Sequence, residues 1–187
     1  MGIMELTQKI ERLAADAGFV YNIASRYYRD VIRSEISLAG ITGQDRILCI
    51  GGGFCPFSAI LLRQMTGAGV TVIDNNSACI TKARQVIERL GLDIYLQCRD
   101  GRCAELSLAE YSVVHFAMQV APIGRVFAEV ERKAAPGTKL LVRRPKECLG
   151  KLYCRQAVPL PSRCAVHDRA GNIGSTYLYI KQGAPAY

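Results

Sequence analysis

The pattern of hydrophobic and polar positions changes period near residue 45. Before that point apolar residues recur at helical spacing, which predicts one amphipathic helix over residues 3–16 and a second over residues 20–38. After it, short apolar runs alternate with segments of helical period. Alternating strands and helices predict a mostly parallel sheet with helices on both faces, a Rossmann-like α/β fold.

The predicted elements of this core can be placed along the chain. Five strands are expected at RILCI (46–50), GVTVID (69–74), DIYLQ (93–97), SVVHFA (112–117) and TKLLVRR (138–144). Helices are expected from Pro56, from Ser77 to Gly91, and over residues 123–135. The runs RCAVHD and STYLYIK flank the turn RAGN and predict a C-terminal antiparallel hairpin. The sheet therefore has seven strands.

Nothing in the sequence divides the chain. There is no internal repeat, low-complexity segment or linker, so residues 1–187 are predicted to form a single domain, with a helical segment over 1–40 and a core over 45–187. Half of the residues are hydrophobic, which is enough for a sizeable core. No apolar stretch reaches the roughly 18–20 residues of a membrane span, and no signal-peptide pattern opens the chain.

The cysteines and the net charge indicate the redox environment of the protein and the kind of partner it binds. The eight cysteines are scattered without a CxxC pair, which favours reduced thiols in a cytoplasmic protein and predicts no metal site. The net charge of +8 favours anionic partners. No arginine-rich tract or interleaving of aromatic and basic residues supports nucleic acid, and solvated helix faces account for most of the lysines and arginines.

The stretch ILCIGGGFCPFSAILL is a strand that breaks into three glycines and resumes as a helix. A P-loop is not favoured, because no lysine follows at the required spacing. Gly51 and Gly53 occupy the first two positions of a dinucleotide fingerprint, but Pro56 stands at the third glycine. The loop therefore permits close backbone approach to a ligand while removing one N–H that a pyrophosphate would use.

Two acidic residues narrow the choice of ligand. Asp74 ends the second strand, where a carboxylate accepts hydrogen bonds from ribose hydroxyls, and Asp100 follows the third strand, where one meets an adenine amino group. Their order after the glycine loop favours S-adenosylmethionine as co-substrate, with NAD as the main competitor. The predicted cofactor-binding residues are Gly51, Gly52, Gly53, Pro56, Asp74, Asn75, Asp100 and Gly101.

GGGFCPFS resembles the corresponding loop of nicotianamine synthase and its bacterial and archaeal relatives: glycine, small residue, glycine, two variable residues, proline, apolar residue, serine or threonine. APGTKLLVRRPKECLGKLY is similar to the family's strand that ends in arginine and precedes a leucine-tyrosine pair. SVVHFAMQV resembles the fourth strand, and YRDVIRSE the helix that precedes the sheet. The match covers roughly residues 27–154 and implies a class I methyltransferase fold.

The resemblance also implies an activity and its residues. The family transfers the 3-amino-3-carboxypropyl arm of S-adenosylmethionine to an amine and releases methylthioadenosine, so a nicotianamine-like chelator and a role in metallophore biosynthesis are expected. Glu35 is the implied base, with Tyr28 orienting it or the acceptor. Arg143 is placed to hold a carboxylate and Tyr153 to close the pocket. His115 is interpreted as a satisfied core residue and left outside this set.

The chain also departs from the family. It is shorter than the plant members, and it has Arg144 and Pro145 where the family pattern has small residues and a histidine. The sequence therefore does not specify the acceptor beyond a small molecule with an amine and a carboxylate. Three alternatives stay open: methyl transfer to a small molecule or protein, S-adenosylmethionine binding without catalysis, and NAD binding. A homodimer is also open.

Overall fold

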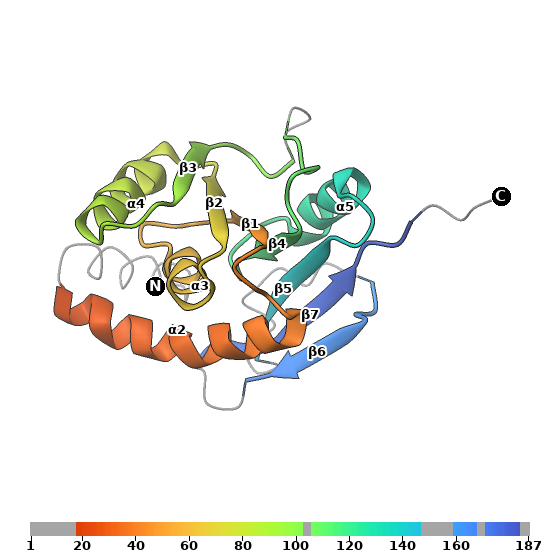
Figure 1. The fold of residues 1–187 in the computed structure, drawn as a ribbon, viewed down its shortest axis with the longest axis horizontal. Helices are drawn as coiled ribbons and strands as arrows, with labels where there is room; N and C mark the ends of the chain where they lie inside the picture. Colours follow the sequence, from red (N-terminus) through yellow and green to blue (C-terminus); the bar gives the residue numbers. More distant parts are fainter. Residues whose placement is uncertain (1–17, 103–105, 147–158, 168–170, 184–187) are drawn as a thin grey trace.

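The computed structural model describes residues 18–102, 106–146, 159–167 and 171–183 (Figure 1). The predicted helix over residues 3–16 and the predicted site residue Tyr153 lie outside these ranges. The helices are α2 (Gly18–Ala39), α3 (Phe57–Thr66), α4 (Ser77–Arg89) and α5 (Ile123–Lys133). The strands are β1 (Arg46–Ile50), β2 (Gly69–Asp74), β3 (Tyr95–Cys98), β4 (Val113–Phe116), β5 (Lys139–Pro145), β6 (Arg163–Val166) and β7 (Ile173–Ile180).

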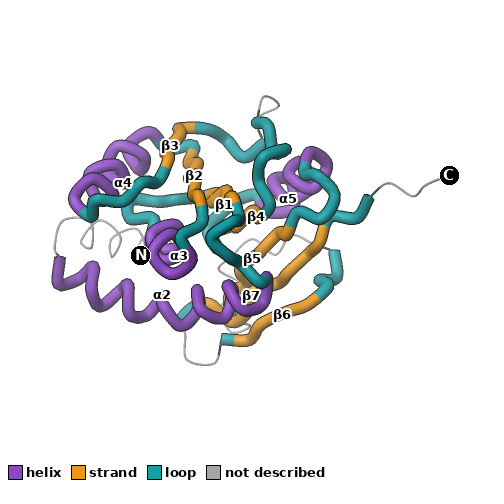
Figure 2. Tube along the Cα trace, viewed as in Figure 1, coloured by secondary structure: helices purple, strands orange, loops and turns teal. Residues whose placement is uncertain are grey.

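All seven strands form one sheet in the order β3-β2-β1-β4-β5-β7-β6. The first five run parallel, whereas β7 is antiparallel to β5 and to β6. The predicted fold class, a mostly parallel seven-stranded sheet with a C-terminal antiparallel hairpin, is confirmed (Figure 2). The strand order reverses between β1 and β4, and such a switch point is where open α/β sheets bind ligands.

Helices cover the two faces of the sheet unequally. Figure 1 shows α2, α3 and α4 on one side and α5 on the other. Successive side chains of a strand point to opposite faces, and β1 follows this rule. Ile47 and Cys49 belong to the hydrophobic cluster that includes α3 and α4, while Leu48 and Ile50 belong to the cluster that includes α5. Because both faces are covered, β1 is almost entirely apolar.

The element boundaries lie close to those predicted, with local differences that have physical reasons. The helix from Ser77 begins there because the Asn76 side chain accepts a hydrogen bond from the Ala78 N–H and caps it. It ends at Arg89, before the left-handed Gly91. The last strand begins at Ile173, two residues earlier than predicted, because the ladder with β5 continues through an irregularity at Pro145.

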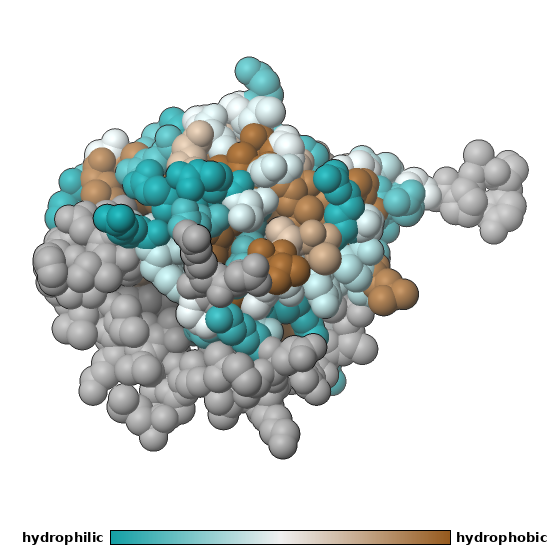
Figure 3. Space-filling view, turned by 90° about the horizontal axis from the view of Figure 1, so that it is seen from below, coloured by the Kyte–Doolittle hydropathy of each residue, from teal (hydrophilic) through white to brown (hydrophobic). Residues whose placement is uncertain are grey.

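The described surface mixes polar and apolar residues. Figure 3 shows hydrophilic and hydrophobic groups interspersed on the face seen from below. Among the described residues, none of the helices has the length and apolar character required to cross a membrane. In the same ranges, none of the cysteines forms a disulfide, and no cluster of three or more potential ligands is placed to hold a metal ion.

Candidate active site

A cavity of about 340 Å³ lies at the carboxyl ends of the central parallel strands. It extends from the loop after β1, across the ends of β2 and β3, to the segment after β4. The structure brings all eight predicted cofactor-binding residues to its lining: Gly51, Gly52, Gly53, Pro56, Asp74, Asn75, Asp100 and Gly101. Tyr28, Arg143 and His115 line it as well.

The glycine loop forms one wall of the cavity because its backbone is packed too closely for side chains. Gly51 has φ +84°, a left-handed conformation that favours glycine, and a Cβ there would lie 3.0 Å from Val120 Cγ2. A Cβ on Gly52 would collide with Val72. The loop therefore offers bare backbone to a ligand, and α3 begins directly after it, next to Pro56.

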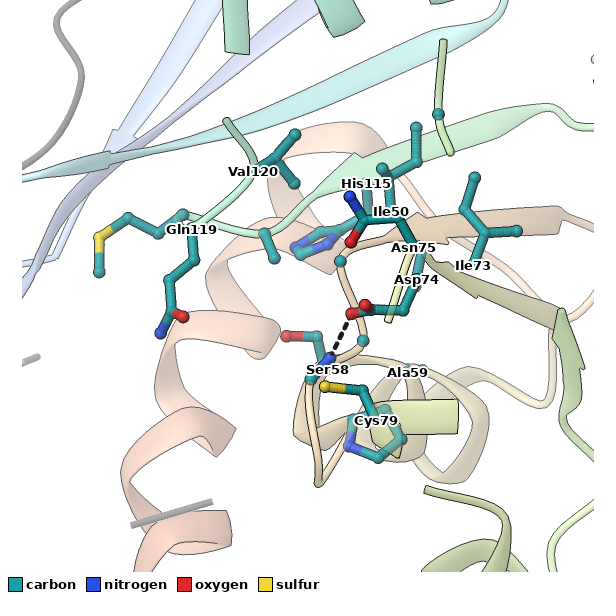
Figure 4. A pocket seen from close by; sticks show the side chains of 18 of the residues that line it. Ile50, Ser58, Ala59, Ile73, Asp74, Asn75, Cys79, His115, Gln119 and Val120 are labelled. Atoms are coloured by element: carbon teal, nitrogen blue, oxygen red, sulfur yellow. Dashed lines mark hydrogen bonds between the residues drawn. The ribbon is translucent and has the colours of Figure 1, made fainter. Parts of the chain in front are cut away.

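Asp74 faces this loop from the end of β2. Its Oδ2 accepts a hydrogen bond from the Gly53 N–H at 2.9 Å, marked by the dashed line in Figure 4, and its Oδ1 accepts one from the Asn76 N–H at 2.9 Å. An ionised carboxylate has about four acceptor positions, so each oxygen keeps one for a ligand. Asn76, not Asp74, caps α4. Asp74 lines the cavity, and its contact with a ribose stays a prediction.

Asp100 is less available than Asp74. Its carboxylate accepts hydrogen bonds from the Arg102 side chain, with Nη2 2.7 Å from Oδ2 and Nε 3.0 Å from Oδ1, and from the Arg102 backbone N–H at 2.8 Å. These hydrogen bonds lower the pKa of Asp100. The predicted contact with an adenine amino group would have to share the carboxylate with Arg102.

Among the residues that the structure describes, the most deeply buried ionisable group is Glu35 of α2, which has no exposed surface. Its Oε1 accepts from Arg143 Nε at 2.8 Å and from Thr176 Oγ1 at 2.7 Å. Its Oε2 accepts from Arg143 Nη2 at 2.9 Å and lies 3.2 Å from His115 Nε2. Burial acts to raise the pKa of Glu35, but Arg143 and His115 outweigh it and hold the pKa well below the usual range.

Arg143 connects this buried group to the cavity. Its Nη1 donates to Ser58 Oγ at 2.8 Å, and its Cζ lies 5.6 Å from the centre of the Tyr28 ring, which itself stacks on Phe57. Burial alone would lower the pKa of Arg143, but Glu35 raises it. Since Glu35 takes the Nε and one Nη2 proton, Arg143 does not present a free bidentate fork to a substrate carboxylate.

The predicted catalytic residues are therefore only partly brought to the cavity. Tyr28 and Arg143 line it, while Glu35 lies behind them and is not among the lining residues. Tyr153 lies outside the described residues. Its predicted role stays a prediction, as does the use of Glu35 as a base.

Three residues of the network were missed by sequence reasoning. His115 is buried, as expected of a core histidine, but it also contacts Glu35 and lines the cavity. Ser58 and Thr176 each hydrogen-bond the Glu35–Arg143 pair. Ser58 stands at the serine-or-threonine position of the glycine-loop pattern, which was a signal for it. A threonine in a strand carries no local signal, and the only available sign for His115 was a lone polar residue within an apolar strand.

The comparison with protein families found no family model that matches the chain. Two curated L-histidine 2-aminobutanoyltransferases of Pseudomonas aeruginosa strains are 30% identical over 114 residues, which is 60% of this chain and 43% of each relative. The enzyme of the same name from Yersinia pestis is 28% identical over 116 residues, 62% of this chain and 43% of the relative. The chain spans less than half the length of these curated relatives.

Solved structures show the fold. A glutamate-to-glutamine mutant of MtNAS superposes with a TM-score of 0.78 at 23% identity, covering 96% of this chain and 71% of that one. MtNAS in complex with MTA and tNA gives a TM-score of 0.75 at 24% identity, with the same coverage. An RNA methyltransferase from Salinibacter ruber in complex with S-adenosyl-L-homocysteine gives a TM-score of 0.65 at 17% identity, covering 84% of this chain and 94% of that one.

Proposed function

We propose that this chain, which has the class I methyltransferase fold and resembles L-histidine 2-aminobutanoyltransferases in sequence, is an S-adenosylmethionine-dependent transferase. It transfers the 3-amino-3-carboxypropyl group to the amine of a small acceptor that also carries a carboxylate, and releases methylthioadenosine. The product is a nicotianamine-like chelator, made in the cytoplasm for metallophore biosynthesis.

One observation supports the choice of S-adenosylmethionine as co-substrate: the bare glycine loop and the Asp74 carboxylate line the same cavity, at the switch point of the sheet. Asp74 keeps an acceptor position on each oxygen, which suits two vicinal ribose hydroxyls. The loop can approach the amino-acid arm of the co-substrate because Gly51 and Gly52 have no side chains. Residues of this cavity thus fit both ends of S-adenosylmethionine.

The transferred group is supported by the relatives and by the polar end of the cavity. The curated relatives are named for aminobutanoyl transfer to L-histidine, an amine that carries a carboxylate. In this protein Tyr28, Arg143 and His115 border the cavity from α2, β5 and β4. These residues are proposed to receive the acceptor, with Glu35 fixing Arg143 and His115 from behind.

Most of the rate in this proposal comes from positioning. The leaving group is a neutral thioether and needs no acid, so the protein must hold the acceptor amine in line with the carbon–sulfur bond and keep the amine neutral. The fold alone does not decide which carbon of the sulfonium is attacked. Methyl transfer is therefore the second candidate, favoured by the structural likeness to the Salinibacter ruber RNA methyltransferase, of which this chain covers 94%.

Product analysis separates the two candidates. Purified protein is incubated with S-adenosylmethionine and L-histidine, then with each other common amino acid, and the nucleoside products are separated by chromatography. Methylthioadenosine supports aminocarboxypropyl transfer, and S-adenosylhomocysteine would establish methyl transfer instead. Release of methylthioadenosine must depend on the acceptor, because acceptor-independent release would be simple breakdown.

A further inference from the structure

We infer that Gln119 determines the specificity for the acceptor, because its side-chain amide donates hydrogen bonds to the acceptor carboxylate. The inference rests on the proposed transfer to an amine that carries a carboxylate. It follows from the anchored turn that bears Gln119, from an amide without a partner in the described part of the chain, and from the engagement of Arg143 by Glu35.

Gln119 lies on a turn that directly follows β4 and is held at both ends. The Ala117 N–H donates to the Ile50 carbonyl at 3.0 Å, and the Val120 N–H donates to the Ala117 carbonyl at 3.2 Å. The turn also packs against the glycine loop, because a Cβ on Gly51 would lie 3.0 Å from Val120 Cγ2 and 3.3 Å from Ala117 Cβ. The Gln119 side chain therefore extends from a fixed backbone.

The amide of Gln119 is available to a ligand. Gln119 lines the cavity and is partly buried. Figure 4 shows its amide on one side of the Ser58 hydroxyl and the Asp74 carboxylate on the other. None of the described residues hydrogen-bonds this amide, which offers two N–H donors and one carbonyl acceptor. A ligand in the cavity can therefore take both donors.

Arg143 is already engaged and does not replace Gln119 in this role. Its Nε and Nη2 donate to Glu35 and its Nη1 donates to Ser58 Oγ, so three of its five N–H groups are taken. The Arg143 side chain is only 3% exposed, and fully buried Glu35 balances its charge. A carboxylate that displaced Glu35 would leave a buried charge without its partner, which is strongly unfavourable. The acceptor carboxylate therefore needs donors outside this ion pair.

The order of the strands separates the two ends of the cavity. Asp74 ends β2 and Asp100 follows β3, on one side of β1, whereas Gln119 follows β4 on the other side. The ends of β2 and β4 are two strand spacings apart, roughly 10 Å. Arg99, another lining cation, follows β3 and is one strand farther still from β4. Since adenosine is proposed to fill the end at Asp74 and Asp100, Gln119 lies at the end left for the acceptor and Arg99 does not.

These hydrogen bonds have a predictable effect on specificity. A hydrogen bond to a charged group is stronger than one between neutral groups. A site built to hydrogen-bond one group of a substrate discriminates against the analogue that lacks this group. The wild-type protein should therefore prefer an amino acid to the amine that remains when the carboxylate is removed. L-histidine and histamine are such a pair, and the preference between them should depend on Gln119.

The test measures kcat/KM for methylthioadenosine release with L-histidine and with histamine. Gln119→Leu removes the amide at similar volume. We expect it to lower kcat/KM for L-histidine by roughly 10–100-fold and to change that for histamine by less than about threefold. Gln119→Glu keeps the shape and adds a negative charge. We expect it to lower kcat/KM for L-histidine further and to raise that for histamine, whose ammonium group it attracts.

Matched controls accompany these variants. Gln64→Glu makes the same charge change at an exposed position of α3 outside the described cavity lining, and it should keep the wild-type ratio. Calorimetry with S-adenosylmethionine should give the wild-type affinity for every variant. Where histamine is turned over too slowly, its inhibition constant against L-histidine replaces its kcat/KM. If another amino acid is the best acceptor, that amino acid and its decarboxylated amine form the pair.

The outcomes distinguish the inference from the proposed function. If the wild-type protein releases no methylthioadenosine with any acceptor, the proposed function fails and the inference fails with it. If the wild type is active but the Gln119 variants lower both acceptors alike, or leave their ratio unchanged, only the inference is overturned. A loss of S-adenosylmethionine affinity in Gln119→Leu would also overturn it, because the amide would then hold the donor. A purely structural role for Gln119 does not move the two acceptors in opposite directions.

Discussion

Three buried side chains contact one another below the protein surface: Glu35, Arg143 and His115. Their charges depend on one another. The carboxylate and the guanidinium cancel, and the imidazole stays neutral because burial lowers the pKa of His115. Removing one member of a buried pair leaves an uncompensated charge, which costs more than the pair itself contributes. At the residue scale, therefore, these three side chains must be treated as one unit.

The charge state of this unit predicts how stability depends on pH. Glu35 has a pKa below that of the unfolded chain, and so has His115. In both cases the unfolded state binds more protons on acidification, so the folded state loses stability as pH falls. The free energy of unfolding should decrease below about pH 6.5, where an unfolded histidine protonates, and more steeply below about pH 4.5. Denaturant titrations at pH 7.5, 5.5, 4.5 and 3.5 measure it.

Two variants test which residue causes each part of the dependence of stability on pH. His115→Gln should flatten the segment between about pH 6.5 and 4.5, and an unchanged slope there would contradict a neutral buried imidazole. Glu35→Gln should cost about 3–5 kcal/mol at pH 7.5, because it leaves Arg143 without its counter-charge. Glu110→Gln, at an exposed ion pair with Arg46, is the matched control and should change stability by less than about 1 kcal/mol.

At the scale of elements, α2 both anchors the site and closes it. Ile32 is completely buried in the cluster shared with α3, and Glu35 lies three residues further along, on the same face of the helix. The packing of Ile32 therefore fixes where the carboxylate meets the sheet. Tyr27, on the same helix, donates to Asn172 Oδ1 before β7, which ties α2 to the C-terminal hairpin.

Truncation of the α2 anchor should be costly. Ile32→Ala is expected to lower the free energy of unfolding by about 2–5 kcal/mol, the range for removing a buried aliphatic side chain. Arg29→Ala on the exposed side of the same helix should change it by less than about 0.5 kcal/mol. Chemical denaturation of both variants checks the difference, and equal losses would mean that α2 does not pack as described.

The sequence predicts the helices and strands far better than it predicts the tertiary contacts between them. β1 and β2 have the predicted bounds, because a buried parallel strand is a short apolar run with clear breakers around it. The glycine loop and Asp74 line the cavity, and their places could be predicted because both follow directly from strand ends. The network at Glu35 was not, because its partners are 80, 108 and 141 residues away. Their contact depends on strand order and register, which no local pattern specifies.

At the scale of the whole molecule, one cavity spans the glycine loop, the end of β2 and the helix α2. A ligand that fills it contacts segments from residue 28 to residue 173 and should stabilise all of them together. Binding to the native state alone raises the free energy of unfolding by about 2.7 kcal/mol at a ligand concentration of 100 Kd.

We therefore expect S-adenosylmethionine to raise Tm by roughly 5–10 °C at that concentration, given the size of this chain. NAD at equal concentration should not raise it, and a larger shift with NAD would refute the choice of co-substrate. Asp74→Asn should weaken S-adenosylmethionine binding by roughly 10–100-fold, because it removes a charged acceptor of hydrogen bonds. Asp93→Asn, exposed at the start of the segment before β3, is the control and should bind as the wild type does.

The antiparallel pairing of β7 with β5 sets Thr176 beside Arg143 and above the carboxylate of α2. The polar interior is thus completed by a residue that follows Glu35 by 141 positions in the chain. A polypeptide ending before residue 163 would keep the parallel strands, but Glu35 Oε1 would then have one buried donor, Arg143 Nε, in place of two. Docking of the C-terminal hairpin therefore adds the last donor to the carboxylate that α2 buries against the sheet.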